Sequence, residues 1–173
     1  MTETLRGISG GFFTVIEGPD GAGKTTVANM VSKLLRENNN FSVTFTREPG
    51  ATEVGRKLRA ILLNNDSDVV PEAEQFLYAA DRVQHLKQVV FPSLADKKIV
   101  LCDRYYPSTY AYQGYGNDVS IADLQQMQRL VGTIEPDLMI VLTCPPEVGL
   151  KRNAAHKPIA NERRFELKGQ SFH

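Results

Sequence analysis

The feature that most constrains the fold is a glycine-rich turn between an apolar segment and a helical one. Residues 12–17 (FFTVIE) are rich in aromatic and β-branched side chains and predict a buried β-strand. Residues 18–25 contain three glycines and predict a tight turn. Apolar side chains recur at helical spacing over residues 25–36, so a helix should follow the turn directly. This order of elements favours an α/β fold with a parallel sheet.

The turn itself, GPDGAGKT, matches the phosphate-binding pattern G-x-x-x-x-G-K-[ST]. Its glycines let backbone N–H groups curl around phosphate oxygens, and the following helix N-terminus adds positive potential. Lys24 would reach the β- and γ-phosphates of a nucleotide, and the Thr25 hydroxyl would ligate Mg²⁺. We therefore predict a site for ATP, with Mg²⁺ as cofactor. Its residues would be Gly18, Asp20, Gly21, Ala22, Gly23, Lys24, Thr25 and Thr26.

The rest of the chain alternates between strand and helix patterns. Strands that are nearly all apolar and alternate with helices predict a mostly parallel central sheet covered on both faces, a three-layer α/β/α sandwich. The length fits one domain over residues 1–173. Further strands are predicted at residues 41–46, 98–102 and 138–143. Helices are predicted at residues 53–63, 72–94 with a kink near Pro92, 120–131 and 146–155, and a short helical or irregular segment at 107–113.

Composition narrows the classes of partner. Lys plus Arg and Asp plus Glu both number 20, whereas a dedicated nucleic-acid binder usually carries a basic excess, so we expect no nucleic-acid partner. No apolar stretch approaches the roughly 18 residues of a membrane span, and the N-terminus lacks a secretory signal, so we expect a cytoplasmic protein without membrane contact. Cys102 and Cys144 end apolar runs and predict small buried side chains.

Polar residues that follow the predicted strands are the candidate site residues, because parallel sheets bind ligands beyond the carboxyl ends of their strands. Asp103 ends the third strand, where a carboxylate typically holds Mg²⁺; an ordinary strand-end turn is the alternative. Arg47 follows the second strand and Arg104 the third. Guanidinium groups suit phosphate oxygens, so we predict both near the phosphate of an acceptor.

A basic cluster lies late in the chain. It is either a solvated helix end and loop, or a lid around residues 152–165 that closes over the phosphates and excludes water. Water exclusion favours transfer over hydrolysis of ATP. The cluster consists of Lys151, Arg152, Lys157, Arg163 and Arg164.

Taken together, these motifs resemble the thymidylate kinase family over nearly the whole chain. The phosphate loop alone identifies only a superfamily, whereas the combination of the later motifs is much more specific. The matching segments are GPDGAGKTT (18–26), TREPG (46–50), EQFLYAADRVQH (74–85), DRY (103–105), STYAYQG (108–114), PDL (136–138) and EVGLKR (147–152).

The resemblance implies transfer of the γ-phosphate of ATP to dTMP, giving dTDP. Asp20 would meet the sugar 3′-hydroxyl, Tyr78 would stack on the base, Arg82 would hydrogen-bond it, and Tyr112 would pack beside the sugar. Core packing is the alternative for Tyr78 and Tyr112. Gly21 and Ala22 carry no charge, so the lid would supply the transfer cation. The dTMP site would comprise Asp20, Arg47, Tyr78, Arg82, Arg104, Ser108, Thr109, Tyr112 and Gln113, and the catalytic groups Lys24, Arg47, Arg104, Arg152 and Arg164.

The chain departs from the family pattern in three places. Thr143 and Arg163 stand where the family usually carries Asp, and the C-terminal helices of the family are expected to be absent after His173. The resemblance also implies a homodimer, formed through helices near residues 72–94 and 120–131. Two other readings stay open: a kinase for another nucleoside or nucleoside monophosphate, and a truncated nucleotide-binding module without turnover.

Overall fold

A four-stranded parallel sheet forms the centre of the molecule. The computed structural model describes residues 10–39 and 41–155. Every described strand pair is parallel, which confirms the predicted sheet. Parallel neighbours need crossover connections, and helices supply them here. The strand order is β2-β3-β1-β4, with β1 at Phe12–Glu17, β2 at Val43–Arg47, β3 at Ile99–Asp103 and β4 at Leu138–Val141.

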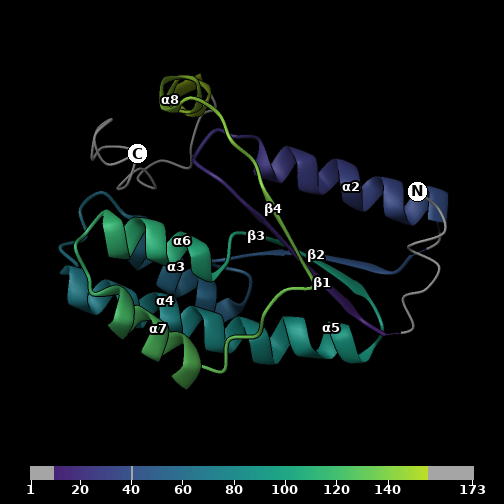
Figure 1. The fold of residues 1–173 in the computed structure, drawn as a ribbon, viewed down its shortest axis with the longest axis horizontal. Helices are drawn as coiled ribbons and strands as arrows, with labels where there is room; N and C mark the ends of the chain where they lie inside the picture. Colours follow the sequence, from purple (N-terminus) through teal and green to yellow (C-terminus); the bar gives the residue numbers. More distant parts are fainter. Residues whose placement is uncertain (1–9, 40, 156–173) are drawn as a thin grey trace.

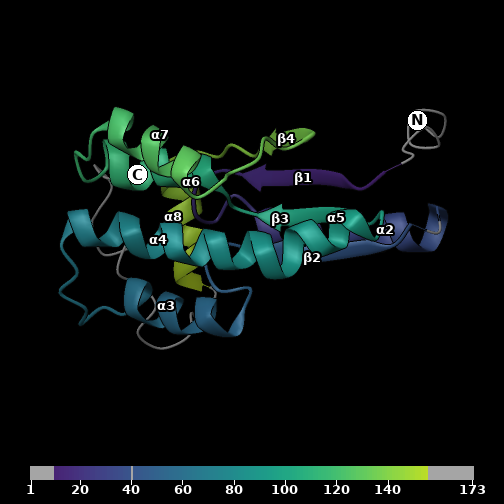
Figure 2. The ribbon, with the colours of Figure 1, turned by 90° about the horizontal axis from the view of Figure 1, so that it is seen from below.

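Helices cover both faces of this sheet (Figures 1 and 2). Helix α2 (Lys24–Asn39) lies on one face, and the continuous helical run of α4 (Pro71–His85), η1 (Leu86–Val90) and α5 (Phe91–Ala95) lies on the opposite face. The predicted three-layer arrangement is thus confirmed. The remaining helices are α3 (Glu53–Leu63), α6 (Tyr106–Thr109), η2 (Tyr110–Tyr115), α7 (Ile121–Leu130) and α8 (Pro146–Ala155). No helix in the described ranges is both long enough and apolar enough to cross a membrane.

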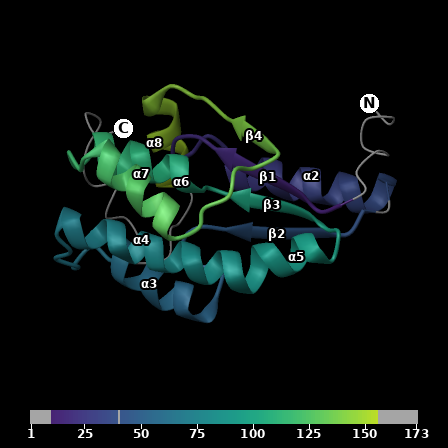
Figure 3. The ribbon, with the colours of Figure 1, turned by 60° about the horizontal axis from the view of Figure 1, so that its bottom comes forward.

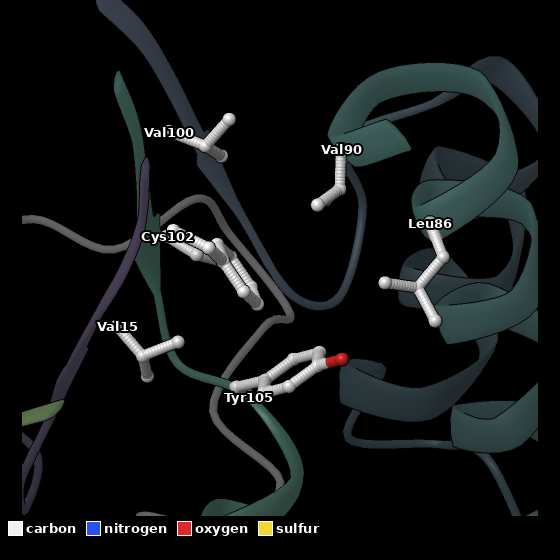
Figure 4. Packing of buried hydrophobic residues seen from close by; sticks show 7 residues of the cluster. Val15, Leu86, Val90, Val100, Cys102 and Tyr105 are labelled. Carbon is white, nitrogen blue, oxygen red and sulfur yellow. The ribbon is translucent and has the colours of Figure 1, made fainter. Parts of the chain in front are cut away.

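The main apolar core lies between the sheet and η1 (Figure 4). Alternate residues of a strand point to the same face, so one face of β1 and β3 presents apolar side chains towards η1. Complete burial of each large apolar side chain stabilises the fold by roughly 1.5–3 kcal/mol. The cluster comprises Phe13, Val15, Leu86, Val90, Val100, Cys102 and Tyr105.

The long helix expected over residues 72–94 is interrupted by a π-helical turn, η1, just before Pro92. In this turn the Phe91 N–H donates to the Leu86 carbonyl, five residues earlier. Pro92 has no N–H to donate, and its ring clashes with the carbonyl four residues back in a regular α-helix. The expected kink therefore takes the form of a wider turn that keeps the chain helical.

Strand register brings the candidate site residues to one edge of the sheet. Asp103 lies opposite Ile16 of β1 and opposite Arg47 of β2. The turn after β1, Arg47 and Asp103 therefore meet at the carboxyl ends of adjacent strands. Figure 3 shows α6, α7 and α8 gathered beyond the same end of the sheet.

Candidate active site

Two cavities meet at this edge of the sheet. The outer cleft has a volume of about 630 Å³ and is lined by the turn after β1, together with Arg47, Asp103 and Arg152. The inner cavity has a volume of about 150 Å³ and lies between α3, α4 and the α6–η2 segment. Four residues line both cavities and form the wall between them. They are Asp20, Glu48, Arg59 and Arg104.

Lys24 is a buried cation in the outer cleft. Its Nζ donates to the Pro19 carbonyl at 2.7 Å and lies 4.0 Å from the Asp20 carboxylate. Burial and, to a lesser extent, the charge of Arg104 lower the pKa of Lys24 to about 8, although the carboxylates of Asp20, Asp103 and Glu17 act in the opposite direction. Its surroundings thus compensate the ammonium charge incompletely, so an anion in the cleft would be strongly attracted.

Thr25 and Asp103 form an oxygen pair that fits a divalent cation. The Thr25 hydroxyl donates to Asp103 Oδ2 at 2.5 Å. The other carboxylate oxygen, Oδ1, is buried and has no hydrogen-bond partner in the described part of the chain. Mg²⁺ takes oxygen ligands and is commonly held by one or two protein groups together with substrate phosphates. Within the described ranges no cluster of three or more His, Cys, Asp or Glu could hold a metal unaided, so phosphate and water oxygens would complete its shell.

Arg104 forms the centre of the shared wall. It has a left-handed backbone with φ of 69°, which is strained for a residue other than glycine. Its guanidinium donates to the Asp20 carboxylate, to Ser108 Oγ at 3.0 Å and to the Tyr112 hydroxyl at 3.3 Å. Burial raises the pKa of Asp20, but the charges of Arg104 and Lys24 outweigh it, so that pKa lies below its ordinary value. Arg104 is therefore a fixed cation between the two cavities.

Glu17 holds the segment that carries these groups. This buried carboxylate at the end of β1 accepts the Tyr105 N–H at 2.8 Å, and both the N–H and the hydroxyl of Ser108, at 3.3 and 2.8 Å. The bonds tie the start of α6 to the strand that precedes the phosphate loop. Glu17 was not among the predicted site residues. A carboxylate at the end of an otherwise apolar strand could have indicated a role at the site.

In the inner cavity, Arg82 is held by buried polar partners. It is 2% exposed, and it donates to Glu48 at 2.8 Å, Gln128 at 2.7 Å and Thr109 at 3.2 Å. Its guanidinium carbon lies 5.2 Å from the centre of the Tyr105 ring. These contacts fix the guanidinium in one orientation at the cavity wall.

Glu48 links this arginine to a buried histidine. One carboxylate oxygen accepts from Arg82, and the other lies 2.8 Å from His85 Nδ1. His85 Nε2 is hydrogen-bonded to the Thr46 hydroxyl at 2.7 Å. The network thus joins the end of β2 to α4. Glu48 and His85 stand inside the quoted motifs, but sequence reasoning assigned them no role, since only the fold brings them into contact.

The structure brings most of the predicted site residues together. Of the cleft and the cavity, the exposed Arg47 lines only the outer cleft, and Gly18 and Ala22 line neither. Gly18 lines a third groove, which borders the inner cavity at Arg104. Arg152 is exposed at the outer cleft, and its Nη1 donates to the Gly21 carbonyl at 3.4 Å. Lys157, Arg163, Arg164 and most of the expected lid lie outside the described residues. The inner cavity includes Asp20, Tyr78, Arg82, Arg104, Ser108, Thr109, Tyr112 and Gln113.

Arg59 of α3 is a further cation that sequence reasoning missed. It lines both cavities, and its Nη1 donates to the Pro49 carbonyl at 3.1 Å. Helical spacing carried a signal, because Arg59 follows Gly55 by four residues and precedes Leu62 by three, and both of these are buried. Arg59 therefore belongs on the inner face of its helix.

Comparisons with known proteins identify the family. The thymidylate kinase family model matches residues 16–173. The thymidylate kinase of Nitratidesulfovibrio vulgaris (strain Miyazaki F) is 44% identical over 167 residues, covering 93% of this chain and 77% of that protein. The thymidylate kinase of Geotalea daltonii is 44% identical over 169 residues, covering 94% and 78%. A crystal structure of thymidylate kinase from Ehrlichia chaffeensis superposes with a TM-score of 0.72 at 36% identity, covering 77% of this chain and 71% of that one. Since the family model and these relatives each match most of its length, the chain belongs to the thymidylate kinase family.

Proposed function

We propose that this chain transfers the γ-phosphate of ATP to dTMP, giving dTDP, in a Mg²⁺-dependent reaction. One observation carries the proposal: Arg104 stands in the wall between a cleft built on a phosphate loop and a cavity of aromatic and polar side chains. Two nucleotides placed in these spaces would meet at their phosphates. The names of the relatives support the same assignment.

In this proposal ATP occupies the outer cleft. Backbone N–H groups of residues 20–26 would surround its phosphates, and Lys24 would leave the Pro19 carbonyl to contact them. Thr25 and Asp103 would hold Mg²⁺, which would neutralise phosphate charge when bound. Arg152, already beside the phosphate loop, and Arg164 supply further cations from a lid around residues 152–165. Residues 1–173 would act as a single kinase domain.

The inner cavity would hold dTMP. Its phosphate would face Arg104, Arg47 and Arg59 across the shared wall, and Asp20 would accept from the 3′-hydroxyl. The base would lie against Tyr78 with its polar edge towards Arg82 and Gln113. The remaining contacts to the sugar and base would come from Ser108, Thr109 and Tyr112.

The transfer step needs positioning and charge stabilisation more than a base. An oxygen of the dTMP phosphate attacks the γ-phosphorus, and the bond from that phosphorus to the β–γ bridging oxygen breaks, so ADP leaves with the bonding pair. A phosphate monoester is already anionic at pH 7, so no side chain has to remove a proton. Lys24 and Arg104 stabilise the charge that spreads over the transferred group.

A coupled ADP-release assay with ATP and Mg²⁺ tests the proposal. We expect turnover with dTMP, none with thymidine, and severe loss of turnover in Arg104→Ala with native folding retained. Turnover with thymidine but not dTMP would instead indicate a nucleoside kinase. Binding of both nucleotides without ADP release would indicate a binding module.

The homodimer implied by the family resemblance stays a prediction. Large apolar side chains are exposed on both helices named for it, Phe76 on α4 and Leu130 on α7. Sedimentation equilibrium of the chain and of Phe76→Ser measures the oligomeric state directly. A monomer at all protein concentrations would contradict the prediction.

A further inference from the structure

Behind the inner cavity, a buried carboxylate fixes the orientation of an amide. Glu74 of α4 has 0% exposure, and Gln113 of η2, which lines the cavity, has 1%. Gln113 Nε2 donates to Glu74 Oε1 at 2.6 Å. Asn117 Nδ2 donates to the same oxygen at 3.0 Å. Two amide N–H groups thus converge on Oε1, which marks this oxygen as an acceptor.

This contact settles which end of the Gln113 amide faces the cavity. A side-chain amide carries a donor nitrogen and an acceptor oxygen of nearly equal shape, so only its partners distinguish the two orientations. Turning the amide over would place its oxygen against the Glu74 oxygen, and two buried acceptors would be left without a proton between them. Glu74 therefore holds the nitrogen on the α4 side and leaves the carbonyl oxygen for a ligand.

Arg82 provides hydrogen-bond donors in the same cavity. Its described bonds use Nε, Nη1 and Nη2 once each, and each Nη atom carries a second N–H. The cavity thus combines a donor from Arg82 with an acceptor from Gln113. Thymine presents the complement on its Watson–Crick edge, with the O4 acceptor next to the N3–H donor. Cytosine presents the reverse, an N4 amino donor next to an N3 acceptor.

We propose that Glu74 is a positioning residue that sets the pyrimidine selectivity of this enzyme by locking Gln113 as an acceptor. The inference rests on the proposed placement of dTMP in the inner cavity. Glu74 does not touch the base; it acts through Gln113. A buried polar group that meets the wrong partner loses its hydrogen bond and leaves both groups desolvated, so the lock discriminates strongly between the two bases.

Substitution Glu74→Gln tests the lock without changing side-chain size. The new amide offers either a donor or an acceptor to Gln113, so the Gln113 amide becomes free to turn over. Dissociation constants for dTMP and dCMP are measured by titration calorimetry, which needs no turnover. We expect the preference for dTMP over dCMP to fall roughly 10- to 100-fold, the effect of one mispaired buried group. Glu72→Gln, exposed on the first turn of the same helix, is the matched control and should keep the wild-type ratio.

Two further variants separate positioning from general damage. Glu74→Asp keeps an acceptor but draws it back by one methylene, so dTMP binding should weaken without any gain for dCMP. In a Gln113→Ala background, Glu74→Gln should no longer change the dTMP to dCMP ratio, because the residue through which it acts is gone. Glu74→Asp also keeps the inference testable should Glu74→Gln fail to fold.

The outcomes distinguish this inference from the proposed function. A wild-type chain that binds dTMP well above dCMP, together with a folded Glu74→Gln variant of unchanged ratio, overturns the role of Glu74 alone. A wild-type chain that does not favour dTMP overturns the proposed function and the inference with it.

Discussion

The outer cleft and the inner cavity hold their buried charges in opposite ways. Among the described residues of the outer cleft, Lys24 contacts a carbonyl at 2.7 Å and a carboxylate at 4.0 Å, and Asp103 Oδ1 has no hydrogen-bond partner. In the inner cavity, Arg82 and Glu48 are paired at 2.8 Å and bonded to further side chains. The charge of Lys24 is therefore left for a ligand of the cleft to balance, whereas the charges of Arg82 and Glu48 are paired before any ligand enters the cavity.

The cleft and the cavity hold their charges differently because they have different tasks in the proposed reaction. A cation such as Lys24 stabilises a moving phosphoryl charge best when no protein carboxylate is bonded closely to it, because full neutralisation in advance would weaken it for the transition state. A group that reads a base must instead be held in one orientation, and buried partners provide that orientation. Substitutions in the cleft should change rates, and those in the cavity should change stability and selectivity.

The largest expected effect follows from Lys24→Ala in the outer cleft. Loss of this cation should lower kcat by roughly 10³-fold or more, as for other groups that stabilise transition-state charge. Stability should be retained, because the substitution also removes a desolvated charge. Steady-state assays and urea unfolding measure the two quantities. Lys33→Ala, exposed on the same helix α2, is the control, and a Lys24 variant with normal kcat would contradict the contrast between the regions.

In the inner cavity, Glu48→Gln should act mainly on stability. It leaves Arg82 buried without its carboxylate, and breaking a buried ion pair typically costs about 3–5 kcal/mol. We expect a fall of that order in the free energy of unfolding, and weaker dTMP binding, because Arg82 loses its fixed orientation. Urea unfolding provides the measurement. Glu53→Gln, an exposed partner of Lys57, should change stability very little, and an equally small effect at Glu48 would show that the cavity is not preorganised by this pair.

A smaller effect is expected where α8 meets the phosphate loop. A Cβ added to Gly149 would overlap the Asp20 carbonyl, and one added to Gly21 would overlap the backbone of Gly149. Alanine normally stabilises a helix interior relative to glycine by about 1 kcal/mol, so close approach explains the glycine here. Gly149→Ala should push α8 off the loop and weaken ATP binding about tenfold, equivalent to roughly 1.4 kcal/mol.

Binding of dTMP measured in parallel sharpens this test, because no residue of α8 lines the inner cavity and α8 contacts its lining through the backbone of Asp20. Glu147→Ala, exposed on the same helix, serves as the control. Unchanged ATP affinity in Gly149→Ala would mean that the loop does not depend on this contact. Equal weakening of both nucleotides would mean that the two regions are not independent.

The smallest expected effect is the uptake of part of a proton by Lys24 when nucleotide binds. The pKa of Lys24 is lowered from 10.5 to about 8 without nucleotide, and a bound phosphate should raise it again. Binding of Mg²⁺-ATP at pH 8 should therefore take up about half a proton, and much less at pH 7. Calorimetry in buffers of different ionisation enthalpy measures this uptake. Absence of uptake at pH 8 would show that Lys24 is already fully charged in the open cleft.

The lowered pKa of Lys24 also determines how the stability of the fold changes with pH. Because the folded pKa lies below the unfolded value, the folded chain holds fewer protons than the unfolded chain between about pH 8 and 10.5, so the contribution of Lys24 to stability rises over that window.

Sequence patterns predicted the outer cleft more completely than the inner cavity. Residues that follow strands can be assigned from local order alone, and Arg47, Asp103 and Arg104 were found in this way. Glu48 and His85 were not predicted, because their hydrogen-bond partners lie 34 or more residues away in sequence. A long-range polar contact leaves no periodicity in the chain, so no local pattern could reveal it.

The amino-acid sequence by itself determined the parallel α/β fold, the phosphate loop and the strand-end charges, because hydrophobic period and glycine placement act over a few residues. Tertiary structure alone decided which side of Gln113 faces the cavity and which carboxylate holds Arg82. Those choices depend on hydrogen bonds between α4, η2 and the end of β2, and such bonds exist only once packing has brought the distant segments together and removed the water that would otherwise compete for them.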